Sequence, residues 1–215
     1  TKCIVIKNAI EKIDFKEKPK DKTSLIYHTT PWRGLVHLLK VFKNLNLKNV
    51  ELNICSSTII YGKKFDKVLG NKYESIFDEC KNSKNINYFG FIENKKIIDL
   101  LKKMHIFSYP SIWPETSCIA AIESMASGCE VVTTNLGALI ETCSNFGTFV
   151  NFDRDIKNLQ KNYTNTLLKS IKNYWSDENQ NKLKLQSENI NTTYSWDVRS
   201  LEWKSFFNKA RKSKV

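Results

Sequence analysis

The chain has 215 residues, which is long enough to bury a sizeable core as one domain with appendages. Hydrophobic residues make up 41% of it and the mean hydropathy is -0.42, and no apolar run approaches the about 18 residues of a membrane-spanning helix. The six cysteines are scattered singly without metal-type spacing, so neither a zinc site nor a disulfide framework is indicated. Reduced thiols and a cytoplasmic location are therefore expected.

The formal net charge of +12 is unevenly distributed along the chain. Residues 105–143 contain four glutamates and no lysine or arginine, whereas residues 204–214 contain five basic residues and no acid. This basic tail either contacts an anionic membrane surface weakly or is a solvated, frayed end. A nucleic-acid partner is not expected, because the basic patch shows no recognisable binding motif and no interleaved aromatic residues.

Runs typical of strands and helices alternate along the chain after a polar, charge-mixed segment over residues 12–22. The expected strands are residues 24–28, 50–56, 86–91, 105–109, 130–135 and 147–152. The expected helices are residues 35–45, 65–81, 94–104, about ten residues after Ser117, 156–174, 177–190, and a last one with Ser195 as its N-cap. This alternation predicts a Rossmann-like α/β fold, a parallel sheet with helices on both faces, whose ligands bind at the carboxyl ends of the strands.

The first strand-to-helix turn contains Arg33 and Gly34. An arginine at such a turn forms charge-assisted hydrogen bonds to a diphosphate, and glycine lets the backbone come close to a ligand. The alternative is a solvated arginine at a helix start. His28, at the end of the preceding strand, is either a ligand or a packed or capping histidine.

Residues 105–143 carry the order of residues that most strongly implies chemistry. A strand ends at Pro110, and a helix follows with Ser117 as the expected N-cap and Gly128 as the residue after its end. Glu123 falls on the apolar face of this helix, where a buried carboxylate requires a partner. Glu115 precedes the helix beside amides that suit a phosphate, those of Thr116, Ser117 and Cys118.

The pattern Pro-Glu, seven residues, then Glu-Ser-Met-Ala-Ser-Gly-Cys-Glu-Val-Val resembles the nucleotide-sugar motif of family-4 retaining glycosyltransferases, which have the GT-B fold. The resemblance implies that Glu115 binds hydroxyls of the donor sugar and that Glu123 binds the ribose of the nucleotide. Without that role, Glu115 would be a solvated loop carboxylate and Glu123 half of a structural ion pair.

Weaker matches surround this motif. Residues 6–11 resemble an Ile-Pro-Asn-Gly-Ile-Asp segment that follows a strand in the family, and residues 136–141 resemble a Gly-Gly-x-x-Glu turn, in which Glu141 either caps the loop or lies exposed. The Ser-Trp pair at residues 195–196 precedes the final helix of the family, which packs back across to the first domain. The resemblance makes Arg33 a diphosphate ligand, puts His28 where a second cation is usual, and places the base near the backbone of Ile92.

Together these features predict the donor-binding C-terminal half of a retaining glycosyltransferase, with Arg33 and Glu115 as catalytic residues. The expected divisions are an inter-domain segment at 1–22, a nucleotide-sugar-binding domain at 23–192, and a C-terminal helix with a basic tail at 193–215. The donor would be a nucleoside diphosphate sugar, with no metal or other cofactor. The N-terminal acceptor-binding domain would be missing, so this chain alone would bind donor without transferring sugar. The alternatives are an inactive nucleotide-sugar-binding or interaction module and an electrostatic binder of nucleic acid or membrane.

Overall fold

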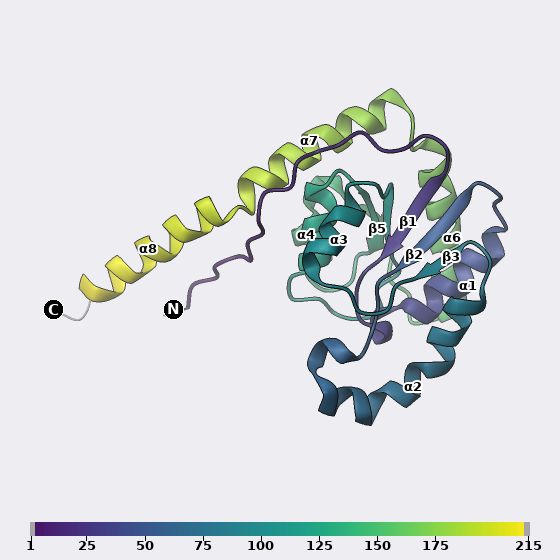
Figure 1. Ribbon diagram of the computed structural model, residues 1–215. Coiled ribbons are helices and arrows are strands. Elements are labelled where there is room, and N and C mark those ends of the chain that lie inside the picture. Colours follow the sequence, from purple (N-terminus) through teal and green to yellow (C-terminus); the bar gives the residue numbers. More distant parts are fainter. Residues whose placement is uncertain (1–2, 213–215) are drawn as a thin grey trace.

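A computed structural model describes residues 3–212 and contains a six-stranded parallel sheet (Figure 1). The strands lie in the order β3-β2-β1-β4-β5-β6, so the chain first builds one half outward from β1 and then crosses to build the other. Their bounds are Thr23–Tyr27 for β1, Val50–Ile54 for β2, Ile86–Tyr88 for β3, Ile106–Tyr109 for β4, Glu130–Thr134 for β5 and Thr148–Val150 for β6. The order reverses between β1 and β4, where a crevice opens at the carboxyl ends of such sheets.

Helices cover both faces of this sheet, as the alternating pattern predicts. Their bounds are Leu35–Leu45 for α1, Lys63–Asn82 for α2, Asn94–Leu101 for α3, Ile119–Ala126 for α4, Leu139–Cys143 for α5, Ile156–Asn173 for α6, Asp177–Thr193 for α7 and Trp196–Lys212 for α8. Helix α1 packs on α6 at one face, whereas α4 packs on α3 and α7 at the other. Short 3-10 helices η1, Pro31–Arg33, η2, Ile59–Tyr61, and η3, Ser144–Phe146, lie in the connections.

The central strands are buried on both sides, which is why their sequences run as continuous apolar stretches. Leu25, Ile26 and Tyr27 of β1 are fully inaccessible to solvent, and every residue of β4 and β5 is buried. The edge strands β3 and β6 keep exposed or partly exposed residues, and Thr23 at the start of β1 and Glu51 in β2 are also partly exposed. The predicted α/β fold class is therefore confirmed, and the rigid centre of the sheet carries the loops at its carboxyl end.

The first described residues do not form the strand that the family resemblance implies before the segment at residues 6–11. Residues 3–9 form none, and the local pairing is one isolated bridge between Ile10 and Ser195. The segment nevertheless packs along α7 (Figure 1), because Ile10 and Ile13 are buried in the core and Asn191 exchanges hydrogen bonds with the backbone of Ile13. Residues predicted to be only a link are thus part of the domain's packing.

Helix α8 extends away from the sheet (Figure 1). Ser195 accepts a hydrogen bond from the backbone N–H of Val198, which confirms it as the N-cap. Trp203 and Phe207 stack on one another at 5.5 Å between ring centroids, yet both are exposed. The last basic residue of the predicted tail, Lys214, lies outside the described residues.

Candidate functional site at the carboxyl ends of β1 and β4

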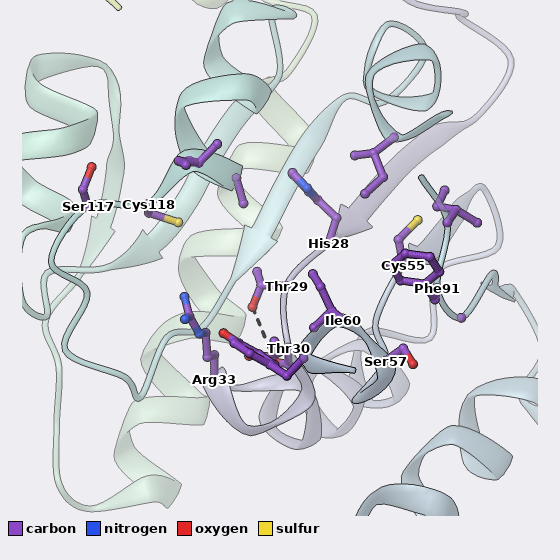
Figure 2. A pocket seen from close by; sticks show the side chains of 16 residues that line it. His28, Thr29, Thr30, Arg33, Cys55, Ser57, Ile60, Phe91, Ser117 and Cys118 are labelled. Carbon is purple, nitrogen blue, oxygen red and sulfur yellow. Dashed lines mark hydrogen bonds between the residues drawn. The ribbon is translucent and has the colours of Figure 1, made fainter. Parts of the chain in front are cut away.

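A cavity of about 310 Å³ opens at the point where the strand order reverses (Figure 2). Its wall comes from the segments that follow β1, β2 and β3 and from the start of α4. The lining residues are His28, Thr29, Thr30, Arg33, Cys55, Ser57, Ile60, Tyr61, Gly90, Phe91, Ile92, Ile97, Ser117, Cys118, Ile119 and Ala120. Its volume lies within the range of about 300–1,000 Å³ that is usual for small-molecule sites.

Arg33 lies in η1, shortly after β1, and among residues 3–212 it is the only arginine or lysine that lines this cavity. Its Nη1 donates to Oε1 of Glu115 at 2.7 Å, and its guanidinium lies 5.9 Å from the ring centroid of Trp113. Burial alone lowers the pKa of Arg33, but the charge of Glu115 and its hydrogen bond, together with the nearby Tyr109 and Tyr61, raise the pKa above its ordinary value. The Nε–H is buried without a partner among the described residues, so the side chain keeps an unused donor.

Glu115 is buried, with a side chain only 4% exposed. The carboxylate oxygen that pairs with Arg33 also accepts a hydrogen bond of 2.6 Å from the hydroxyl of Tyr109, at the end of β4. The backbone of Glu115 is fixed as well, since its carbonyl accepts a 2.7 Å hydrogen bond from the N–H of Ala138. A solvated loop carboxylate is therefore excluded, and Glu115 holds the ends of β1 and β4 together.

Two glycines make this arrangement possible. Gly34 has a φ of +138°, and a Cβ there would lie 2.2 Å from the carbonyl oxygen of Pro110. Gly137 has a φ of +63°, and a Cβ there would lie 2.6 Å from both the N and the O of Glu115. The backbone at Gly34 thus comes close to the loop after β4. Gly34 does not line the cavity, so its role in ligand binding stays a prediction.

Helix α4 begins one residue later than predicted. Cys118 is its N-cap residue and makes no side-chain cap hydrogen bond, whereas the expected cap, Ser117, accepts a 3.0 Å hydrogen bond from the side chain of Asn8. The amides of the first turn have no acceptor within the helix, and this end of α4 lines the cavity together with Ser117 and Cys118. Burial raises the pKa of the Cys118 thiol to about 12, so it is neutral. Thr116 precedes this end and does not line the cavity.

Glu123 lies on the buried face of α4, as its spacing predicts. Its partner is the side-chain amide of Asn94, which donates to Oε1 at 2.9 Å, and not a cation as an ion pair would require. Burial raises the pKa of Glu123, and the hydrogen bond from Asn94 offsets only part of that effect. The residue does not line the cavity in this structure, so its contact with a ribose stays a prediction.

His28 and Ile92 both line the cavity. The Nε2 of His28 lies 2.9 Å from the hydroxyl of Ser124, and its ring packs against Phe107 with centroids 4.7 Å apart. Burial lowers the pKa of His28 to about 3, so the imidazole is neutral. The structure thus shows a packed histidine that also borders the cavity.

The sequence interpretation missed an aromatic cluster at the mouth of the cavity. The ring of Trp32, in η1, lies with its centroid 5.6–5.8 Å from those of Tyr61, Phe65 and Tyr73, and Tyr61 itself lines the cavity. Helix α2 carries two of these rings, Phe65 and Tyr73, which are half-buried, and the periodicity of its sequence indicates only a surface helix. The sequence feature that could have indicated this cluster is the position of Trp32 directly before Arg33.

Within residues 3–212, no three histidine, cysteine or acidic side chains gather in a way that could hold a metal ion. Over the same residues, no helix combines the length and the apolar character that crossing a membrane requires.

Six parallel strands in this order, with a cavity at the switch point, define a Rossmann-like α/β domain of the kind found in GT-B glycosyltransferases. The chain matches the family described as Glycosyl transferases group 1 over residues 7–187, and it belongs to that family.

Solved structures with the same fold include a glycosyltransferase from Rickettsia africae, with a TM-score of 0.71, 18% identity, and coverage of 89% of this chain and 48% of the other. The Anabaena protein Alr3699/HepE, solved with UDP-glucose, gives a TM-score of 0.62 at 14% identity, covering 88% and 49%. An uncharacterized 41.2 kDa protein in the cps region of Klebsiella pneumoniae is 24% identical over 67% of this chain and 37% of its own length. The chain thus spans half or less of the length of these relatives.

Proposed function

We propose that this chain is the donor-binding half of a retaining glycosyltransferase and that its cavity binds a nucleoside diphosphate sugar. The observation that carries the proposal is Arg33, which borders the cavity opposite the segments after β2 and β3 and beside the start of α4. A guanidinium and free helix amides together suit a diphosphate. The Anabaena relative was solved with UDP-glucose and the pneumococcal O-GlcNAc transferase GtfA with UDP and GlcNAc, which supports the same ligand class here.

In the proposed reaction, the bond between the anomeric carbon and the diphosphate breaks, and a bond to an acceptor oxygen forms on the same face of the sugar. Arg33 stabilises the charge that grows on the leaving diphosphate, helped by the first-turn amides of α4. Glu115 fixes the guanidinium and contacts hydroxyls of the donor sugar, while Glu123 contacts the ribose. Thr116, Ser117 and Cys118 surround the diphosphate, Gly34 supports the turn, and Ile92 borders the base. No metal takes part in this proposal, and the reaction takes place in the cytoplasm.

The acceptor is proposed to bind to a second domain. Support comes from the relatives, which are about twice as long as the part that this chain matches. Helix α8 offers an exposed aromatic surface at Trp203 and Phe207 on which such a domain could pack. Weak contact of the basic tail with an anionic membrane is a further proposal, and no nucleic-acid partner is proposed.

One observation favours a second candidate, a module that binds nucleotide sugars without transferring them. In the part of the chain that the structure describes, no other arginine or lysine lines the cavity, and the charge of Arg33 is already paired with Glu115. A single paired cation stabilises a leaving diphosphate less than two free cations would. Sugar transfer to an acceptor by the full-length protein would exclude this candidate.

Titration of the chain with a panel of UDP-, GDP- and ADP-sugars tests the proposal and identifies the base. The substitution Glu123→Ala should weaken the nucleotide that binds by about 1–3 kcal/mol, because charged or strongly polar hydrogen bonds to the ribose are lost. A matched control is Glu130→Ala. Glu130 is also buried, but it lies at the amino end of β5, and the cavity lies at the carboxyl ends of the strands. Equal affinity in wild type and a folded Glu123→Ala variant would refute the ribose assignment.

A further inference from the structure

The hydrogen bonds around His28 fix which of its nitrogens carries the proton. The hydroxyl of Ser124 lies 2.7 Å from the carbonyl oxygen of Ala120, which can only accept, so the single hydroxyl proton is used there. The contact of 2.9 Å between Ser124 and Nε2 of His28 must then be donated by the imidazole. The neutral ring therefore carries its proton on Nε2, and Nδ1 is left with a lone pair.

That lone pair faces an accessible position. Nδ1 makes no hydrogen bond to the residues described, yet it is not among the polar atoms that are sealed from solvent without a partner. His28 as a whole is only 8% exposed and lines the cavity, so the accessible part of the ring is directed to the cavity (Figure 2). A buried acceptor that points into a binding cavity selects for a ligand group that donates.

We propose that His28 is a specificity residue whose Nδ1 accepts a hydrogen bond from a hydroxyl of the bound nucleotide sugar. The hydroxyl belongs either to the ribose or to the transferred sugar. This inference rests on the proposed function and adds to it that His28 does not bind the diphosphate. A phosphate oxygen at Nδ1 would set one lone pair against another, and the low pKa of the ring keeps it from becoming a cation there.

The position of the ring explains why it stays neutral and fixed. It packs on Phe107 from β4 and is held by Ser124 from α4, so one strand and one helix determine its orientation. The titratable group next to Ser124 is Glu123, whose contact is with Asn94 and not with the imidazole. His28 therefore needs no conformational change to offer its acceptor.

Imidazole ¹⁵N chemical shifts of the labelled chain test the assignment directly, because they distinguish a protonated from an unprotonated ring nitrogen. The three histidines are assigned by replacing each in turn, including His28→Phe. Before ligand is added, His28 should show one protonated and one unprotonated nitrogen. A saturating nucleoside diphosphate sugar should then shift the unprotonated signal as it accepts a hydrogen bond.

Affinities then identify the source of the hydroxyl. His28→Phe should weaken binding of the nucleotide sugar about fivefold, the effect of one neutral hydrogen bond, and leave inorganic pyrophosphate unaffected. A ribose contact predicts the same loss for the nucleoside but no loss for its deoxy analogue, whereas a sugar contact predicts a loss only with the complete donor. His37→Phe is the matched control, since His37 lies in α1 and does not line the cavity, and its affinities should stay within twofold of wild type.

A protonated Nδ1, or donor binding that leaves the Nδ1 signal unmoved, would overturn the assignment while the proposed function stands. A loss of pyrophosphate affinity in His28→Phe would overturn it too. If no nucleotide binds at all, the proposed function and this assignment both fail.

Discussion

Two buried glutamates of the same loop and helix, Glu115 and Glu123, are held in opposite ways. Glu115 pairs with the charge of Arg33 and also accepts a hydrogen bond from Tyr109, whereas Glu123 accepts one hydrogen bond from the neutral side chain of Asn94. Burial of Glu123 beside a partner that is only neutral disfavours its ionised form, which agrees with its raised pKa. The two regions therefore teach that similar burial can join one glutamate to a charged partner of the framework and leave the other with a single neutral partner.

The largest expected effect on stability is that of Glu115→Ala. The substitution leaves the Arg33 guanidinium and the Tyr109 hydroxyl without their acceptor in a largely buried place, so the free energy of unfolding should fall by about 3 kcal/mol. Urea denaturation measures it. The control is Glu141→Ala, whose carboxylate is 68% exposed and 3.6 Å from Lys7, and which should change stability very little. Equal effects for the two substitutions would contradict the framework role of Glu115.

The contact between Gly137 and Glu115 gives the next largest effect. Gly137→Ala should lower the free energy of unfolding by about 2 kcal/mol, because the new Cβ meets the backbone of Glu115 at a positive φ. Gly62→Ala separates the backbone strain of a positive φ from the steric clash of the new Cβ. Gly62 also has a positive φ, +94°, but there is open space around its Cβ position. Thermal unfolding of the two variants should therefore rank Gly137→Ala as the less stable, and the reverse order would show that the close approach is unimportant.

The smallest expected effect is that of Glu123→Gln, which should keep the hydrogen bond from Asn94 and stay within about 1 kcal/mol of wild type at neutral pH. The folded-state pKa of Glu123 is raised, so the folded protein binds its proton more tightly than the unfolded chain. Its stabilising contribution is complete below the unfolded pKa and is lost as pH rises through the folded pKa. The stability of wild type relative to Glu123→Gln should thus decline as pH rises through that window. A rise over the same window, measured by urea denaturation at several pH values, would mean that Glu123 has a cationic partner in solution.

Much of the fold was predictable because local patterns and packing agree. Parallel strands that are buried on both faces give continuous apolar runs. The site residues Arg33 and Glu115 could be predicted because they lie in the loops after β1 and β4, where such sheets bind ligands. The sequence alone did not predict that these two side chains pair, since their contact depends on how the ends of the two strands lie next to each other.

Other features escaped the sequence for identifiable reasons. Ser117 has the chemistry of an N-cap, yet its hydroxyl is occupied by Asn8, a residue distant in the sequence, and α4 starts after it. The apolar run over residues 2–7 has the composition of a strand, but the described part of it does not pair with a strand of the sheet. Asn94 gave no signal as the partner of Glu123, because an asparagine at the start of a helix ordinarily indicates only the helix boundary.

The central claim is that Arg33 holds a diphosphate, and calorimetry on Arg33→Gln tests it most directly. Wild type and variant are titrated with the nucleoside diphosphate that binds and with its nucleoside, and unfolding curves verify that the variant is folded. The account predicts a loss of about 1.5–3 kcal/mol for the diphosphate, as expected for hydrogen bonds to a charged group, and almost none for the nucleoside. Equal losses for the two ligands would contradict the claim and would mean that Arg33 supports Glu115 and the loop without contacting the phosphates.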